Sequence, residues 1–263
     1  MVFKTVNLFN QTNLMKTCTA LLLLLITPAA ALAQDEPIET DRPDQTETTA
    51  TVPAGMFQSE SGFTHRQAER NGRELILPET LWKYGINDKL ELRLITEFEF
   101  NKYGDSLAQG LEPVDIGLKV NLWDEKGIVP ETSIILTIKL PKVASKDLAV
   151  DYVAPEIRLL FQNTITDNID LGYNLSADWD GTSPNPIFEY TLSPNFKLSE
   201  TISAYAEAFG YLPEQQHATH WIDGGFKYLI TKNIQVDISG GYELTSHNHF
   251  HSYFESVGFS FRI

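Results

Sequence analysis

From Met56 onward, apolar and polar side chains alternate in segments of about ten residues. Residues 90–100, LELRLITEFEF, place Leu92, Leu94 and Phe98 on one face and glutamates on the other. A period of two residues is that of a β-strand whose two faces meet different surroundings. About twelve such segments occur, each near the 9–11 residues that a tilted transmembrane strand needs. They span residues 56–67, 76–86, 90–101, 112–123, 131–141, 152–164, 169–179, 186–196, 201–212, 219–230, 234–245 and 253–263.

The connections between these segments alternate between short and long. Tight turns are expected at residues 87–88, 166–168, 199–200 and 231–233. Longer loops are expected at QAERNGRE, NKYGDSLAQG, PKVASKDLAV, DGTSPN, PEQQHAT and TSHNHFHS, and DEKGIV is long for a turn. Bacterial barrels have an even strand number, short periplasmic turns and longer extracellular loops. The sequence therefore predicts an all-β fold, a closed antiparallel transmembrane β-barrel of about 12 strands with both termini periplasmic.

Alternation alone does not decide which face of the sheet is inside, because soluble and membrane barrels reverse the two faces. The terminal strand from Tyr253 to Ile263 is rich in aromatic residues, as in outer-membrane barrels, where it serves as the assembly signal. Aromatic residues near strand ends, such as Trp82, Trp179 and Tyr228, fit an interfacial girdle. A hydrophobic fraction of 42% suits a membrane barrel, since only alternate residues face lipid.

The start of the chain has the features of a secretory signal peptide. Met15 and Lys16 precede an apolar run over 20–26, and Ala31-Leu32-Ala33 is an A-x-A cleavage site. We expect residues 1–33 to be the signal peptide, the precursor to begin at Met15 and the mature chain to begin at Gln34. The outer membrane is the predicted location. Residues 34–55 would form an acidic N-terminal segment, and residues 56–263 the barrel. The only cysteine, Cys18, lies in the signal, so the mature chain has no disulfide and no cysteine metal site.

The chain is strongly acidic. Its formal net charge is −15 from 20 basic and 35 acidic residues. The first 33 residues hold two lysines and no acid, which leaves −17 for the remainder. This sign argues against nucleic acid as a partner. The expected partners are outer-membrane lipid and lipopolysaccharide, the barrel-assembly machinery and a small-molecule solute.

If the apolar face meets lipid, the charged face lines the lumen. Buried charges must be paired or hydrated, so the lumen holds an ion-pair network or water. These charges either form a selective binding site or only hold the strands in register. The candidate lumen-lining residues are Glu91, Arg93, Glu97, Glu99, Asp115, Lys119, Glu156, Arg158, Asp223, Lys227, Asp237 and Arg262.

The Pro-flanked N-terminal segment carries Asp41, Arg42 and Asp44 and is too polar to form a core by itself. It is either a disordered periplasmic tail or a plug inside the barrel. A guanidinium away from bulk water needs a carboxylate partner. In the plug reading we therefore expect Arg42 close to inward acids such as Glu97, Glu99 or Glu156.

Three histidines, His247, His249 and His251, alternate and would share one side of an extended segment. With His217 and His220 in the preceding long loop they could form a metal site of imidazoles; the alternative is that they are ordinary polar loop residues. No cofactor is otherwise predicted. G-x-S-x-G, H-E-x-x-H and phosphate-binding loops are absent, so we predict that the protein is not an enzyme.

The pieces IETDRPDQTETTATVPAG, MFQSESGFTH, WIDGGFKYLITKNIQVDISGGYEL and VGFSFRI resemble an outer-membrane family labelled as transporters of the MetA pathway of phenol degradation. The resemblance implies an outer-membrane β-barrel transporter or channel, and by its label aromatic or other hydrophobic compounds as cargo. Together these features predict passive passage of small solutes, with an acidic lumen that disfavours anions. The alternatives are a phospholipase-like barrel hydrolase and a purely structural barrel.

Overall fold

Antiparallel strands make up the regular structure of the described residues, which are 36–69, 72–214, 217–245 and 250–263 in a computed structural model of the 263-residue chain. This part of the chain contains no helix long and apolar enough to cross a membrane. The strands are β1 (Phe57–Glu69), β2 (Gly72–Asn87), β3 (Leu90–Tyr103), β4 (Ser106–Leu111), β5 (Val114–Trp123), β6 (Glu131–Leu140), β7 (Ala154–Thr166), β8 (Ile169–Asp178), β9 (Ile187–Lys197), β10 (Ile202–Pro213), β11 (Thr219–Thr231), β12 (Ile234–Glu243) and β13 (Tyr253–Arg262).

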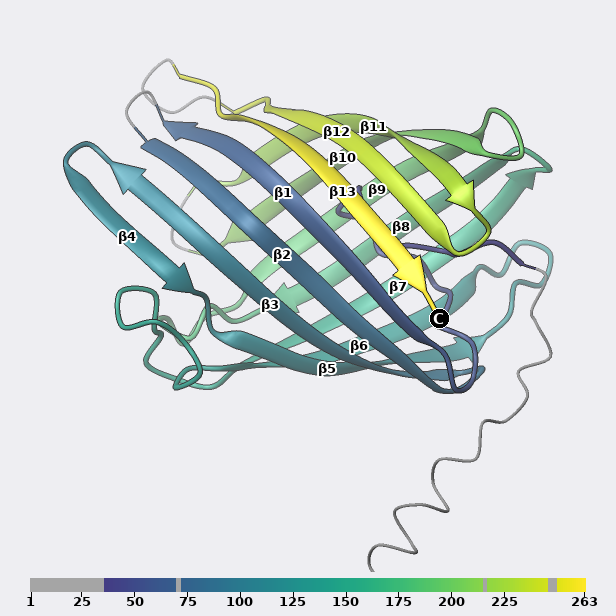
Figure 1. Cartoon of the computed structure of the whole chain (residues 1–263), viewed down its shortest axis with the longest axis horizontal. Coiled ribbons are helices and arrows are strands. Elements are labelled where there is room, and N and C mark those ends of the chain that lie inside the picture. Colours follow the sequence, from purple (N-terminus) through teal and green to yellow (C-terminus); the bar gives the residue numbers. More distant parts are fainter. Residues whose placement is uncertain (1–35, 70–71, 215–216, 246–249) are drawn as a thin grey trace, which may run out of the picture. The chain divides into compact units, whose positions relative to one another are not determined.

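The sheet closes on itself through its first and last strands. β1 pairs with β13 from Gln58 opposite Arg262 to Gln67 opposite Tyr253, and it also pairs with β2. Every other strand of the ring pairs with its sequence neighbours, with β3 followed by β5. Figure 1 shows the resulting ring of tilted strands. The prediction of a closed antiparallel barrel of about 12 strands is confirmed.

β4 is a strand that the sequence reading missed, because the segment NKYGDSLAQG was expected to be a loop. It pairs with the outer half of β3, from Phe98 opposite Leu111 to Tyr103 opposite Ser106, whereas β5 pairs with the inner half. Pro113 separates the two strands, since proline has no N–H to donate to a ladder. β4 and β5 therefore share one position in the ring, and twelve positions remain.

Strand boundaries differ most between β1 and β2. The segment QAERNGRE was expected to be a long loop, but β1 runs to Glu69 and β2 starts at Gly72. That expectation was wrong because the alternation continues in polar residues, which carry no hydrophobic signal. At the opposite rim the chain returns to its start, since Phe57 N donates to Ile263 O over 2.9 Å. The short turns lie at this rim, together with the longer connection at residues 124–130.

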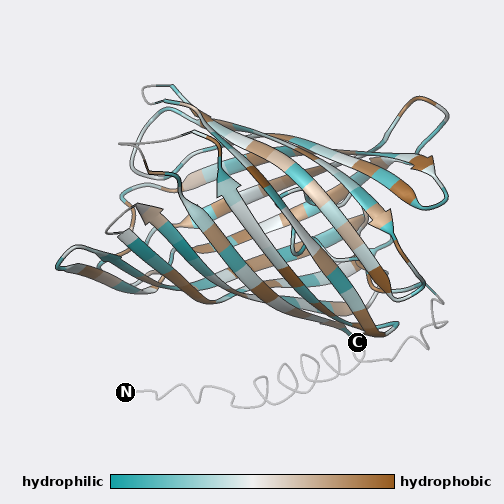
Figure 2. Ribbon diagram, turned by 90° about the horizontal axis from the view of Figure 1, so that it is seen from above, coloured by the Kyte–Doolittle hydropathy of each residue, from teal (hydrophilic) through white to brown (hydrophobic). Residues whose placement is uncertain are grey.

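The barrel is polar inside and apolar outside. Inward-facing Glu91 and Lys119 are fully buried, whereas outward-facing Phe226 and Ile238 are each 56% exposed. Figure 2 shows the alternation along the strands. Outward apolar positions on β3 run from Leu90 to Phe100, which at ~3.3 Å per residue and a tilt of ~40° is about 25 Å. This is the height of the apolar band of membrane barrels. The apolar face is therefore the outer, lipid-facing one, a question that alternation alone left open.

The outer face should tolerate charge only near its rims. We expect Leu94→Arg, at the middle of the outward face of β3, to lower the free energy of unfolding in phospholipid vesicles by about 2–4 kcal/mol. The same change at Ile86, at the rim, should cost about 0–1 kcal/mol. Denaturant titrations of both variants measure this, and equal losses would contradict a lipid-facing exterior.

Candidate functional site: the lumen and the segment inside it

Residues 36–55, here called the inner segment, lie inside the barrel. Both ends of the segment are at the rim of the short turns, where Ile38 N donates to Lys232 O over 2.7 Å and Gly55 N donates to Gly85 O over 2.8 Å. Between these ends the segment hydrogen-bonds to side chains on each of the twelve ring strands, from β1 to β13 with β4 excepted. Only a segment within the ring can do this, and Figure 1 shows it in dark purple.

Asp41 is the most strongly bound residue of the inner segment. Its carboxylate accepts from Lys83 Nζ at 2.8 Å, from Arg93 Nη1 at 3.0 Å and from Lys119 Nζ at 2.9 Å. These cations come from β2, β3 and β5. Burial alone would raise the pKa of the Asp41 carboxyl, but Lys119, Lys83 and Arg93 outweigh it and hold that pKa well below its usual range.

Further contacts neutralise the same cluster. Glu47 Oε2 lies 2.6 Å from Arg93 Nη2, and Lys119 also donates to the backbone oxygen of Thr48 over 3.0 Å. Glu91 accepts from the backbone N–H of Val52 over 2.8 Å and pairs with Arg93 at 3.2 Å. Buried charges are tolerated when they are paired and hydrogen-bonded, and here the segment and the wall supply each other's partners.

Arg42 occupies a notch in the wall made by two glycines. Its Nη2 donates to Asp237 Oδ1 over 3.2 Å and to Ser256 Oγ over 2.9 Å. Gly62 and Gly258 lie directly opposite each other on β1 and β13, and a Cβ on either would overlap the guanidinium. Glycine at both positions therefore leaves the space that the docked guanidinium occupies.

The expected partners of Arg42 were wrong. Glu97 and Glu99 line an outer cavity, and Glu156 pairs with Arg158 over 2.7 Å. The sequence identifies the charged residues. It does not indicate how deep in the lumen, or at which strand, the segment contacts the wall. The inward glycines of β1 and β13 were the available signal.

On the opposite wall, hydroxyls and a lysine hold the segment. Asp44 Oδ1 lies 3.2 Å from Lys227 Nζ, and Ser193 Oγ donates to Asp44 Oδ2 over 3.0 Å. Thr46 Oγ1 lies 2.7 Å from Thr191 Oγ1 and 2.5 Å from Glu207 Oε1. These contacts connect the segment to β9, β10 and β11.

The structure places the candidate lumen residues in three groups. Those in contact with the inner segment are Glu91, Arg93, Lys119, Arg158, Lys227, Asp237 and Arg262. Glu156 and Asp223 bond to wall residues instead, to Arg158 and to the Tyr205 hydroxyl. Glu97, Glu99 and Asp115 line the outer cavity.

The outer half of the lumen has two unlike walls. A cavity of about 300 Å³ on the β2 to β6 side is lined by Glu74, Glu97, Glu99, Glu112 and Asp115, with Lys139. On β10, β11 and β13 stands a buried cluster of Phe209, Trp221 and Phe254, with Tyr211 beside it.

Sequence reasoning missed this aromatic cluster, although alternation carried a signal for it. On β11, Trp221 shares the face of Asp223 and Lys227, which are two and six residues further along the strand. An aromatic residue on the charged face of its strand must point into the lumen.

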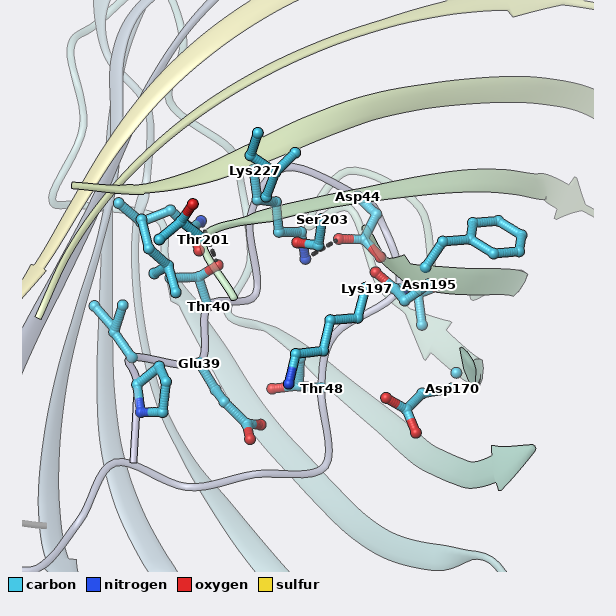
Figure 3. A pocket seen from close by; sticks show the side chains of 18 of the residues that line it. Glu39, Thr40, Asp44, Thr48, Asp170, Asn195, Lys197, Thr201, Ser203 and Lys227 are labelled. Atoms are coloured by element: carbon cyan, nitrogen blue, oxygen red, sulfur yellow. Dashed lines mark hydrogen bonds and ion pairs between the residues drawn. The ribbon is translucent and has the colours of Figure 1, made fainter. Parts of the chain in front are cut away.

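The inner half of the lumen contains a second cavity of about 310 Å³. It lies between the inner segment and the β7 to β12 wall. Figure 3 shows Glu39, Asp44, Lys197, Ser203 and Lys227 around it, with Lys227 bound to Asp44. The cavity extends to the turn between β9 and β10 and so reaches the rim.

The histidine prediction is only partly within the described residues. His247 and His249 lie outside them. His251 Nδ1 lies 2.9 Å from Glu243 O, and His220 Nδ1 lies 2.8 Å from the Tyr190 hydroxyl. No group of three or more His, Cys, Asp or Glu side chains in the described part of the chain is arranged to hold a metal ion. A histidine metal site stays a prediction.

Comparisons with known proteins agree with this architecture. A family model described as "Putative MetA-pathway of phenol degradation" matches residues 40–263. An outer-membrane channel from Pseudomonas putida F1 is similar, with a TM-score of 0.66 and 10% identity over 86% of this chain and 100% of that chain.

Two porins are also similar in structure. The NanC porin has a TM-score of 0.52 and 11% identity over 77% of this chain and 98% of that chain. The KdgM porin in complex with disordered oligogalacturonate has a TM-score of 0.53 and 10% identity over 77% and 98%. At these identities the likeness concerns the fold. A sequence comparison with curated proteins gave no match.

Docking of the inner segment should depend on Asp41. Asp41→Asn leaves three buried cations short of one negative charge, and breaking a buried pair costs about 3–5 kcal/mol. We expect much faster hydrogen exchange of the backbone amides of residues 41–52 in this variant, measured by mass spectrometry in detergent. Asp105→Asn, in the exposed turn between β3 and β4, is the matched control. Equal exchange in the two variants would contradict the ion-pair anchor.

Proposed function

Since the chain belongs to the family described as "Putative MetA-pathway of phenol degradation", we propose that it is an outer-membrane barrel for passive passage of small solutes. The observation that carries the proposal is a charged lumen inside an apolar cylinder, with one cavity in its outer half and one in its inner half. A purely structural barrel needs no such cavities. The solved channel and the two porins described above share the fold.

The proposal includes delivery by a cleaved signal peptide. Residues 1–35 lie outside the described part of the chain, so its support is the A-x-A pattern before Gln34. Intact mass and N-terminal sequencing of protein isolated from outer membranes should give a chain that starts at Gln34. A chain that retains Cys18 would contradict cleavage.

The lumen should prefer cations. The outer cavity has five carboxylates and one lysine in its lining, and low-dielectric walls focus the field of such charges along a pore. In planar lipid bilayers we expect channels with a reversal potential that indicates cation selectivity. The double variant Glu97→Gln, Glu99→Gln should reduce that selectivity without closing the channel, because it removes two ionisable carboxyl groups and keeps the side-chain volume.

Each alternative has its own outcome in the same experiments. Anion preference would contradict the electrostatic part of the proposal, and the absence of conductance under any condition would favour a structural barrel. The proposal gives the protein no catalytic role. Turnover of phospholipid that is lost in His249→Ala would support the hydrolase instead.

We further propose that the inner segment acts as a plug that narrows the lumen. Deleting residues 36–50 removes no strand and lets water reach the wall charges that the segment neutralises, so the barrel should fold and keep its heat-modifiable mobility on gels. We expect conductance to rise severalfold. Cation preference should fall, because the deleted residues include five acids and one base. Unchanged conductance in a folded variant would contradict the plug.

A further inference from the structure

The inner segment packs closely against the β1 to β6 side of the lumen. Towards β1 to β6, Gln58, Glu60, Glu91 and Lys119 are all at most 1% exposed. A Cβ at Gly85 would overlap the backbone oxygens of Val52 and Pro53, so not even a methyl group fits there. From the level of Asp41 down to the rim, these described residues of the wall are packed against the segment.

The other side of the segment borders a cavity that reaches the rim. The cavity of about 310 Å³ is bounded by the segment and by residues of β7 to β12, among them Ser203 and Lys227. Figure 3 shows these side chains around the open space. The cavity in the inner half of the lumen thus lies beside β7 to β12.

The inner face of β10 leads from this cavity to the aromatic cluster. Ser203 lines the inner cavity, and Phe209 belongs to the aromatic cluster of the outer half. Between them, Tyr205 is 4% exposed and donates its hydroxyl to Asp223 over 2.7 Å. Glu207, which is 4% exposed, is the residue of β10 that the segment contacts through Thr46.

The contact between the segment and Glu207 consists of short hydrogen bonds. A solute that passes between the segment and β10 would break them. Glu207 Oε2 accepts from the backbone N–H of Gln45 over 2.8 Å, and Oε1 lies 2.5 Å from Thr46 Oγ1. Thr46 also contacts Thr191 on the neighbouring strand β9. These are few bonds, and none of them is an ion pair, unlike the Asp41 anchor on the opposite wall.

We propose that solutes cross the lumen along the inner face of β10 and that the contact of Thr46 with Glu207 and Thr191 is the narrowest point of the route. This inference rests on the proposed passage function and adds its path. The aromatic cluster forms the outer part of the path and the cavity beside Ser203 its inner part. The Asp41 anchor keeps the segment in place while its Thr46 side separates from the wall.

A pair of matched cysteine variants tests the position of the route. Ser203 and Ser133 are inward residues near the starts of β10 and β6, at the same rim, but Ser133 is fully buried against Thr49 O at 2.6 Å. In a chain with Cys18→Ser, a small charged methanethiosulfonate reagent should modify Ser203→Cys and at least halve its conductance. Ser133→Cys should show neither effect.

Two readouts separate failure of the route from failure of the function. Mass spectrometry reports modification without any need for conductance. Full modification of Ser203→Cys with unchanged current, or equal modification at both positions, would overturn the route. A barrel that never conducts would overturn the proposed function, while the modification contrast would still decide where the open space lies.

The narrowest point has its own test. Thr46→Val keeps the side-chain volume and removes the hydroxyl from Glu207 and Thr191. We expect conductance to rise at least twofold. Thr49→Val, on the β6 side of the same segment, should leave conductance unchanged. An equal rise in both variants would overturn the assignment of the constriction.

Discussion

Charge neutralisation in a space closed to bulk water is the constraint on which the rest of this structure depends. Lys83, Arg93 and Lys119 project from three neighbouring positions of the wall towards one point. The wall itself offers them Glu60 and Glu91, which pair with Lys83 and Arg93. Asp41 and Glu47 of the inner segment complete the set. An unpaired buried charge costs several kcal/mol, so the wall and the segment each need the other.

Shape reinforces this electrostatic dependence. Gly62 and Gly258 make the notch for the guanidinium of Arg42, and Gly85 lets the backbone near Pro53 pass close to the wall. The fit is close on the side of the ion-pair anchor. On the side of β8 to β12 the segment is held by hydroxyls, Glu207 and the Asp44–Lys227 pair, and it leaves a cavity. One segment thus combines a rigid attachment with an opposite side that is less tightly packed.

Much of the fold follows from alternation, because lipid and a polar lumen impose opposite demands on successive residues. The predicted ends of β3, β8 and β12 fall within two residues of those observed. β4 was not predicted because its polar residues do not alternate with apolar ones. Pro113 also interrupts the pattern between β4 and β5. Alternation also placed Arg93 and Lys119 on the inner face, where the structure has them.

The contacts between the segment and the wall were beyond the sequence. Which acid meets which cation depends on how far the segment reaches into the lumen, and local patterns carry no measure of that depth. Asp41, Arg42 and Asp44 were identified by their charge and position in the chain. Their partners come from strands distant in sequence, such as Lys227 and Asp237.

The central claim is that the inner segment is docked in the lumen of the barrel as it stands in the membrane. Its most direct test is a disulfide between Thr46→Cys and Thr191→Cys, whose hydroxyls are 2.7 Å apart and buried. With Cys18→Ser in the same chain, mild oxidation of intact outer membranes should cross-link the pair nearly completely, seen as a mobility shift that a reductant reverses. Absence of the cross-link, with free modification of the Thr46→Cys thiol by a membrane-impermeant maleimide, would show that the segment lies outside the barrel.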